Sequence, residues 1–333
     1  MRDRPVGVSD GDLVAALAAG WGLDVRAVEY RPVGFGSYHW AVRAGDARDD
    51  VQAGDGSAPD AGPREFFVTV NALSGEPSTA LRELGRAFDT ALALRRDAGL
   101  EFVVAPVPDR TGATVRPLGS GHCLSLFPLV DGVAGDFGPH RSEDLPGMLD
   151  LLVRLHRAEA APGTPSIAVV LPGRDDLDAA LRDLGRAWTG GPYAEPARVL
   201  LSRRAAHLHD LLGQFDRLAG QVRDTSGSWV VTHGEPHPGN VIRGPEGLRL
   251  IDWDTVRLAP PERDLWMLDG DEDLLACYAR ATGHRVSPAA LALYRLWWDL
   301  ADIAVYVSEL RGPHEATQDT TAAWTYLVGY LAG

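Results

Sequence analysis

The sequence predicts an α+β protein with a strand-rich first third and a helical remainder that carries one embedded β-hairpin. In the first third, short apolar runs alternate with glycine-containing turns, which is typical of strands. After Asp131-Gly132, apolar residues recur at helical spacing. Two short apolar runs at 229–232 and 248–251, the second after a turn at 244–247, interrupt the helical pattern and predict the hairpin.

The first third begins with a predicted helix at 10–21, where Leu13, Val14 and Leu17 recur at helical spacing after an Asp cap. Residues 44–64 are rich in Gly, Ala and Asp and contain almost nothing apolar, so we expect an exposed, mobile hairpin tip there. The other predicted elements are strands at 25–30 and 39–43, a strand at 65–70, a long helix at about 78–98, and strand candidates at 103–106, 114–117 and 121–130.

The helical remainder has no internal repeat and no low-complexity tail. The strand-like pattern gives way to a helical pattern near residues 130–136, so we expect a first lobe at 1–130 and a second lobe at 131–333. The predicted helices are 145–157, 175–188, 195–223, 261–282, 288–310 and 320–331.

Composition narrows the class of protein. The net charge of −14 argues against a nucleic-acid partner and is compatible with a small cationic substrate. No apolar run reaches the roughly 18–20 residues that span a bilayer, and the N-terminus lacks the apolar stretch of a signal peptide. We therefore expect a soluble, cytoplasmic protein without a membrane partner. The two cysteines, Cys123 and Cys277, lie in apolar contexts and are expected to be buried thiols.

The chain contains no lysine, and all 32 basic residues are arginine. A Walker-type phosphate loop needs a lysine before its Ser or Thr, and Schiff-base chemistry needs a lysine amine. The sequence excludes both.

The residues most suggestive of chemistry gather around the predicted hairpin. Glu235 and Asn240 lie five residues apart on one loop, and Asp252 follows twelve residues later, directly after a strand. A hairpin of this length would bring Asp252 back beside Asn240. Phosphoryl transfer requires hard oxygen ligands for Mg²⁺ and a carboxylate that orients the acceptor hydroxyl and takes its proton. The loop and strand together could supply all three groups.

The pattern His233-Gly234-Glu235-x-x-x-x-Asn240, followed by Ile251-Asp252-Trp253-Asp254, resembles the aminoglycoside phosphotransferase family, whose fold is the bilobal fold of protein kinases. Within that family, the stretches 250–265 and 302–306 look most like spectinomycin phosphotransferases. The resemblance extends over nearly the whole chain, and the hairpin motif is its most specific part. It implies a small β-rich lobe at 1–130 that binds the nucleotide and a larger helical lobe at 131–333 that carries the catalytic hairpin and the substrate residues.

The resemblance implies a role for each matching residue of the hairpin. Glu235 takes the position of the catalytic base, and Asn240 and Asp252 take the positions of the Mg²⁺ ligands. His233 would hold the catalytic loop in shape, and Asp264 would brace it from the following helix.

The resemblance also implies a nucleotide site in the first lobe, for ATP or GTP. The turn Gly34-Phe35-Gly36-Ser37 would lie over the phosphates with its backbone N–H groups facing them. In the connector between the lobes, the Pro128 carbonyl and the Val130 N–H would bond the adenine edge. The glycine turn taken alone is better explained as an ordinary hairpin turn; its place ahead of the catalytic hairpin favours the phosphate loop.

Three positions depart from the family pattern. The base position, usually Asp, is Glu235, and one extra methylene moves a carboxylate by roughly 1 Å. The strand lysine that holds the phosphates should fall near Thr69, and its helix partner, usually Glu, near Arg86. We hypothesise that Arg86, oriented by Glu83, contacts the nucleotide phosphates in place of the lysine. A slip of one turn would make Arg82 the contacting residue instead.

Other polar residues are candidate substrate contacts. We expect Glu235 to reach the acceptor hydroxyl and His237 to touch substrate or serve as a capped loop residue. Asp254 is expected to assist the metal from behind its ligands, with a simple cap of the turn as the alternative. On the predicted helix at 288–310, Trp298, Asp302 and Glu309 could present acids among aromatic rings to a cationic aminocyclitol. The alternative is that the tryptophans are core residues and the acids are solvated.

These features predict a Mg²⁺-dependent phosphotransferase that uses ATP or GTP and acts on a hydroxyl of a cationic aminocyclitol, an aminoglycoside-type antibiotic or a related amino sugar. Three alternatives stay open. The missing lysine and altered base are compatible with a nucleotide-binding pseudokinase. A kinase of a biosynthetic intermediate would share the same motifs, and a metal-binding scaffold without transfer activity would bind metal without nucleotide.

Overall fold

The computed structural model describes residues 1–46, 64–73, 75–223, 229–268 and 270–332. The chain divides into two compact units, Met1–Ser166 with Val231–Leu258, and Ile167–Val230 with Ala259–Gly333. The predicted mobile tip at 44–64 falls almost wholly on residues 47–63, outside the described residues. The predicted lobe boundary near residue 130 stays a prediction.

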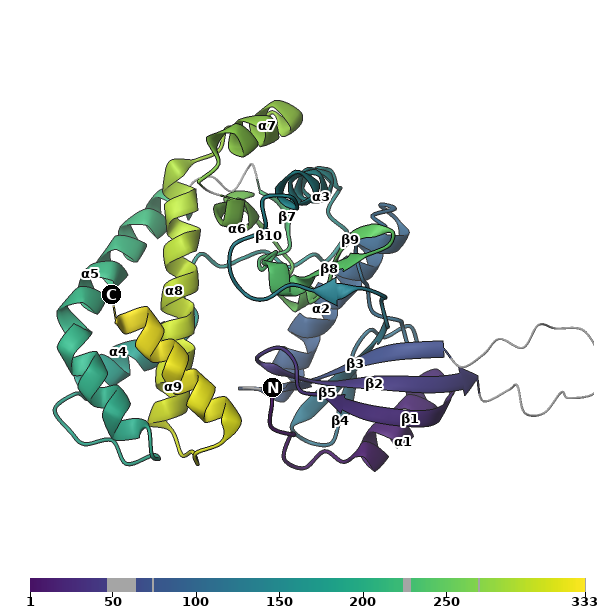
Figure 1. Cartoon of the computed structure of the whole chain (residues 1–333), viewed down its shortest axis with the longest axis horizontal. Helices are drawn as coiled ribbons and strands as arrows, with labels where there is room; N and C mark the ends of the chain where they lie inside the picture. The colour runs from purple at the N-terminus through teal and green to yellow at the C-terminus, as the bar shows by residue number, and fades with distance from the viewer. Residues whose placement is uncertain (47–63, 74, 224–228, 269, 333) are drawn as a thin grey trace, which may run out of the picture. The chain divides into compact units, whose positions relative to one another are not determined.

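A five-stranded antiparallel sheet forms the body of the first unit (Figure 1). The even-numbered residues of its central strands, such as Trp40, Val68 and Leu126, pack on Leu13 and Leu17 of helix α1 (Asp10–Trp21). Because side chains alternate along a strand, the odd-numbered residues lie on the opposite face. In spatial order the strands are β1 (Leu23–Arg31), β2 (Ser37–Asp46), β3 (Arg64–Ala72), β5 (His122–Pro128) and β4 (Arg116–Leu118).

Helix α2 (Pro77–Arg96) belongs to the opposite face of this sheet. Glu76 caps its first turn by accepting from the backbone N–H groups of Ser78 and Thr79. Phe88 of α2 meets Phe127 of β5 edge to face, with ring centroids 5.4 Å apart. Farther on, α2 also packs beside the 3₁₀ helix η3 (Trp253–Thr255), so the sheet and the motif residues near 252 share one unit.

A hairpin is present around the predicted turn at 244–247, but the predicted strands at 229–232 and 248–251 do not pair with each other. Strand β9 (Gly247–Leu250) pairs with β8 (Val241–Gly244), and the short β6 (Val133–Ala134) pairs with the other edge of β8. Strand β7 (Val230–Thr232) pairs with β10 (Arg257–Ala259) instead. The two-residue connection between β8 and β9 closes a much shorter loop than a pairing of β7 with β9 would, so it costs less conformational entropy.

The predicted strand at 103–106 is wrong. Val103 makes only an isolated parallel bridge to Leu250, supported by hydrogen bonds from Val104 N to Leu250 O and from Leu250 N to Phe102 O. Pro106 and Pro108 offer no N–H to a ladder, so the pairing ends there. Helix α3 (Leu145–Arg157) has the predicted bounds and belongs to the first unit.

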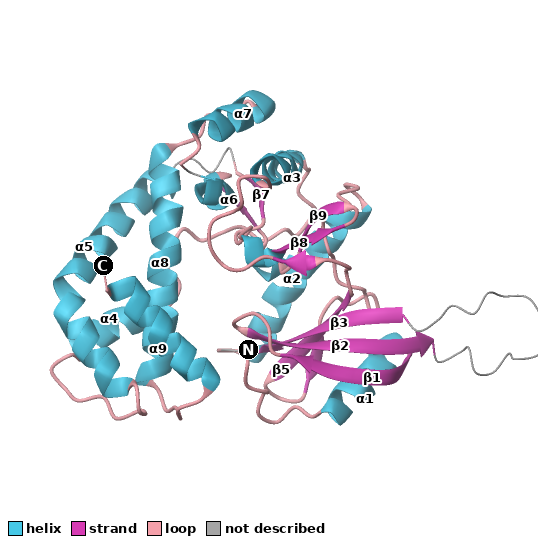
Figure 2. Ribbon diagram, in the orientation of Figure 1, coloured by secondary structure: helices cyan, strands magenta, loops and turns pink. Residues whose placement is uncertain are grey.

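The described part of the second unit consists almost wholly of helices (Figure 2). Their common core gathers apolar residues of α4, α5, α8 and α9. The predicted helix at 261–282 is broken into α6, the 3₁₀ helix η4 (Trp266–Leu268) and α7, and α7 begins anew where Asp271 caps Leu274 N. The helices are α4 (Arg174–Arg182), α5 (Ala194–Arg223), α6 (Glu262–Leu265), α7 (Glu272–Thr282), α8 (Pro288–Arg311) and α9 (Gln318–Leu331).

Among the described residues, no helix combines the length and apolar character that crossing a bilayer requires. Both cysteines are free thiols. Cys123 is buried, and burial raises its pKa to about 11, whereas Cys277 is only half-buried. The expectation of two buried thiols therefore holds for Cys123 alone.

Candidate functional site

The structure brings Glu235, Asn240 and Asp252 together at the open end of the β8–β9 hairpin. Asn240 ends the 3₁₀ helix η2 (Pro238–Asn240) and directly precedes β8. Ile251 N donates to Asn240 O at 3.0 Å, which sets the following residue, Asp252, beside Asn240. Asn240 Nδ2 donates to Glu235 O at 3.0 Å, so the amide holds the loop and its Oδ1 faces away from that bond.

His233 connects this loop to the neighbouring strand. Its ring is fully buried and lies edge-on to Trp253 at 4.6 Å. Glu235 N donates to Nδ1 at 3.2 Å, so the ring proton is on Nε2, which donates to Ile251 O at 2.8 Å. The imidazole therefore fixes the backbone of Glu235 relative to the residue before Asp252.

Asp252 has an unusual backbone and an unusual charge environment. Its φ of 64° makes it the only non-glycine residue with positive φ among the described residues. The pKa of Asp252 is raised well above its usual range by burial of the carboxylate and by the negative charges of Asp254 and Glu235. Asp252 also shares a hydrogen bond with Asp254. The three carboxylates of Asp252, Asp254 and Glu235 therefore repel one another through their negative charges.

This donor set fits a divalent cation. A bound cation relieves the repulsion among the carboxylates, and carboxylate and amide oxygens are ligands that Mg²⁺ accepts. In the described ranges, no three His, Cys, Asp or Glu side chains are grouped closely enough to cage a metal by themselves. A cation held by Asn240 and Asp252 would complete its shell with oxygens from elsewhere, as Mg²⁺ does with phosphate groups.

The glycine turn joins β1 to β2 in the same unit. Gly34 and Gly36 have φ values of 69° and 86°, a conformation that a residue with a side chain rarely adopts. Phe35, between them, is exposed. The Met1 nitrogen donates to the carbonyl oxygens of Gly34 and Ser37, so these hydrogen bonds hold the turn by its carbonyls.

At the strand position where the family pattern has lysine, Thr69 is buried between two polar neighbours. It pairs with His39 on β2 and with Ser125 on β5, and its Oγ1 lies 3.3 Å from His39 Nδ1. Sequence analysis did not single out His39 or Ser125, because only the strand register shows that they flank Thr69. Pro128 ends β5 and is exposed, and Val130 follows it, half-buried.

Arg86 lies on the exposed side of α2. Its Nε donates to Gly163 O at 3.0 Å, and one turn later Thr90 Oγ1 bonds Thr164 Oγ1 at 3.3 Å. These contacts attach this side of α2 to the segment that follows α3. The role of Arg86 in phosphate binding stays a prediction.

A second histidine that sequence analysis did not single out supports the loop. His140 Nε2 donates to Pro236 O at 2.8 Å, although 96 residues separate them. His237 is half-buried against the edge of Phe137 at 5.1 Å, and burial, with the nearby His233 and His140, lowers its pKa to about 4. His237 is therefore neutral near pH 7.

The remaining site candidates belong to the second unit. Asp264 is fully buried in α6, and Trp298 of α8 is nearly so, with its ring 5.9 Å from that of Trp266. Asp302 accepts from Tyr330 of α9 at 2.7 Å, and burial with the charge of Asp299 raises its pKa to about 6. Glu309 is also half-buried, and burial raises its pKa. The tryptophan is a core residue, whereas the acids are not simply solvated.

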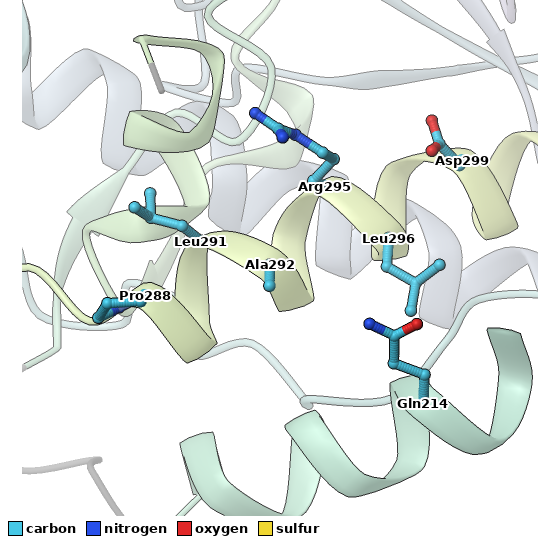
Figure 3. A pocket seen from close by; sticks show the side chains of 7 residues that line it. All are labelled: Gln214, Pro288, Leu291, Ala292, Arg295, Leu296 and Asp299. Carbon is cyan, nitrogen blue, oxygen red and sulfur yellow. The ribbon is translucent and has the colours of Figure 1, made fainter. Parts of the chain in front are cut away.

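A pocket of about 310 Å³ opens between α5 and α8 in the second unit (Figure 3). Gln214 of α5 and Arg295 and Asp299 of α8 supply its polar groups, and apolar side chains line the rest. None of the site residues predicted from the sequence lines this pocket.

Comparison with known proteins identifies the relatives of the chain. The model of a family described as "Phosphotransferase enzyme family" matches residues 57–302. Protein StrN of Streptomyces griseus is 30% identical over 256 residues, which cover 74% of this chain and 76% of StrN.

Solved structures with the same fold include a spectinomycin phosphotransferase in complex with ADP and spectinomycin, with a TM-score of 0.71, 16% identity, and coverage of 97% of this chain and 94% of that chain. A microcompartment-associated aminopropanol kinase has a TM-score of 0.57 and 15% identity, with 97% and 96% coverage. These similarities confirm the predicted α+β, kinase-like fold, with a small antiparallel sheet followed by a helical part.

Proposed function

The chain belongs to the phosphotransferase enzyme family, and on that premise we propose that it transfers the terminal phosphoryl group of ATP or GTP to a hydroxyl of a cationic aminocyclitol or aminoglycoside-type molecule. The observation that carries the proposal is the crowding of Glu235, Asn240 and Asp252 at one end of the β8–β9 hairpin. We place the reaction in the cytoplasm, with no nucleic acid or membrane as partner.

Glu235 is the proposed base. Its carboxylate would orient the acceptor hydroxyl and accept its proton as the oxygen attacks phosphorus. His233 and the Asn240 amide both bond the Glu235 backbone, which limits movement of the longer side chain at a position usually held by Asp. Pro236 and Pro238 stiffen the following residues.

Asn240 and Asp252 are the proposed ligands of Mg²⁺. When bound there, Mg²⁺ would neutralise negative charge on the phosphate oxygens. Asp254 stays close to Asp252 and would help to keep its carboxylate oriented. Asp264 would brace the loop, as the family resemblance implies.

The nucleotide would lie against the sheet of the first unit. Backbone N–H groups of the glycine turn, Gly34–Ser37, would face the phosphates, and the Pro128 carbonyl and Val130 N–H would bond the base. Thr69 is adjacent to this region on β3, and Arg86 remains a proposed phosphate contact from α2.

A cationic acceptor is supported by the chemistry of the second unit and of the relatives. Asp302 and Glu309 are half-buried acids on helix α8, and Asp302 accepts a hydrogen bond from Tyr330 of α9. Carboxylates of this kind attract an ammonium group through their charge. The acceptors named for two structures of this fold, spectinomycin and aminopropanol, each carry an amine and a hydroxyl. A role in antibiotic resistance would follow if the acceptor is an antibiotic.

A pseudokinase is the second candidate, favoured by Thr69 at the lysine position. To distinguish the two, the enzyme is incubated with Mg²⁺ and ATP or GTP, with and without spectinomycin or a panel of amino sugars and amino alcohols. Diphosphate release and the mass of the acceptor are followed. We expect acceptor-dependent diphosphate and a phosphorylated acceptor, both lost in Glu235→Gln. Glu246→Gln makes the same chemical change on the exposed hairpin turn and should retain activity. Nucleotide binding without transfer to any acceptor would favour the pseudokinase.

A further inference from the structure

The face of the first unit's sheet that lies opposite α1 is unusually polar. The register aligns His39, Thr69 and Ser125 across strands β2, β3 and β5. The next row toward the glycine turn holds Ser37, Asn71 and Cys123. Two buried polar atoms on this face, Ser125 Oγ and Asn71 Oδ1, have no hydrogen-bond partner among the described residues. A buried sheet face of this kind normally packs apolar side chains, so its polarity needs a reason.

His39 is the residue of this face that reaches the glycine turn. Its ring stacks on Phe67, with centroids 5.1 Å apart. Nδ1 lies 3.3 Å from Thr69 Oγ1, and Nε2 lies 3.3 Å from the place where a Cβ on Gly34 would stand. The imidazole thus extends from the strand position that lacks lysine to the first glycine of the turn. Within the part of the chain that the structure describes, Nε2 has no hydrogen-bond partner.

The hydrogen bond between Thr69 Oγ1 and His39 Nδ1 is compatible with either neutral tautomer, because a hydroxyl can donate or accept. In the tautomer in which Thr69 donates to Nδ1, the ring proton lies on Nε2, and this is the tautomer that a phosphate contact would select. Burial and the positive charge of the Met1 amino group lower the pKa of His39 to about 4, so the ring is neutral near pH 7 and in this tautomer offers one N–H donor toward the turn. Phosphate oxygens only accept hydrogen bonds. The Gly36 N–H of the turn donates to Met1 Sδ at 3.3 Å, so a phosphate bound there would replace that contact with a stronger acceptor.

We infer that the Nε2–H of His39, held by Thr69, binds a phosphate oxygen of the nucleoside triphosphate beneath Gly34. This inference rests on the proposed function. The chain would thus use a neutral donor on the strand where kinases of this fold use a lysine, since the sequence contains no lysine. A hydrogen bond to a charged group of this kind corresponds to about a 10- to 100-fold gain in affinity.

The test compares binding of ADP and of adenosine by isothermal titration calorimetry. His39→Ala should weaken ADP binding about 10- to 100-fold and leave adenosine binding unchanged, because only ADP has the phosphates. His39→Gln places an amide N–H near the Nε2 position and should recover most of the loss. His39→Phe keeps the stacking on Phe67 without a donor, and it replaces the alanine variant if that variant does not fold. His122→Ala, on the α1 side of the same sheet, is the matched control and should bind both ligands normally.

The outcomes separate this inference from the proposed function. If the wild-type protein binds ADP and the His39 variants bind it equally well, the inference is wrong and the proposed function stands. An equal loss of adenosine and ADP affinity also overturns it, since that would indicate general damage to the site. If the wild-type protein binds neither ligand, the proposed function itself fails. In His39→Ala, the further change Thr69→Lys should restore ADP binding, because a lysine there returns a phosphate donor to the same strand.

Discussion

Replacing His233 with alanine tests how the catalytic loop is held. The imidazole is fully buried, accepts from Glu235 N and donates to Ile251 O. Its removal leaves two backbone groups without their partner, each costing about 1–3 kcal/mol, and opens a cavity beside Trp253. We expect His233→Ala to lower the free energy of unfolding by about 3–6 kcal/mol, a large part of the stability of a typical domain.

The same substitution should slow catalysis in the molecules that stay folded. Without its anchor, Glu235 can move by about 1 Å, and such displacements cost on the order of 10²-fold in rate. Urea unfolding followed by tryptophan fluorescence measures the stability, and kcat is measured at a temperature where the variant is folded. His233→Asn can keep the acceptor for Glu235 N, so it should recover more of kcat than His233→Gln, which can keep only the donor to Ile251 O. A stability loss below about 1 kcal/mol together with kcat within threefold of wild type would refute this reasoning.

Three further predictions concern carboxylates. Asp252→Asn should reduce activity by about 10³-fold, because a metal ligand is lost. Its thermal midpoint should stay level or rise, because the charge repulsion with Asp254 is relieved, and a lower midpoint would contradict this. Burial raises the pKa of Asp109, but hydrogen bonds from Thr111 and Arg116 outweigh burial and hold this pKa down at about 2. The carboxylate therefore stabilises the fold above about pH 4 and loses that contribution as pH falls through about 2. In urea unfolding, Asp109→Asn should lower the free energy of unfolding by about 2 kcal/mol at pH 7 and leave it unchanged near pH 2. Burial and the charge of Asp299 raise the pKa of Asp302 to about 6. As pH falls below about 6, Asp302 takes up a proton and loses its negative charge, so the KM of the wild type for a cationic acceptor should rise. Asp302→Asn should instead show a high KM at every pH, without that rise.

Much of the catalytic hairpin could be predicted from the sequence, because its information is local. Glu235 and Asn240 share one loop, and a strand must return Asp252 toward them. The partner of β9 was less certain, since β7 and β8 are both short apolar runs of suitable character. The two-residue loop between β8 and β9 costs less conformational entropy to close than the longer loop between β7 and β9. A prediction from the spacing of apolar runs does not take this difference into account.

The support around the site could not be predicted in this way. His39 lies beside Thr69 only because β2 and β3 pair in one register, and a shift of one residue would put their side chains on opposite faces of the sheet. His140 bonds Pro236 across 96 residues, a contact that no local pattern indicates. The fold class was predictable because strands and helices occupy separate parts of the chain; the break between α6 and α7 depends on local capping at Asp271.

The most direct test of the central claim is mass spectrometry of the acceptor after incubation with Mg²⁺ and a nucleoside triphosphate. The account predicts one phosphoryl group on a hydroxyl of an amine-bearing acceptor, formed in step with diphosphate, and absent with Glu235→Gln or Asp252→Asn. Product formed at an undiminished rate by both variants would contradict it.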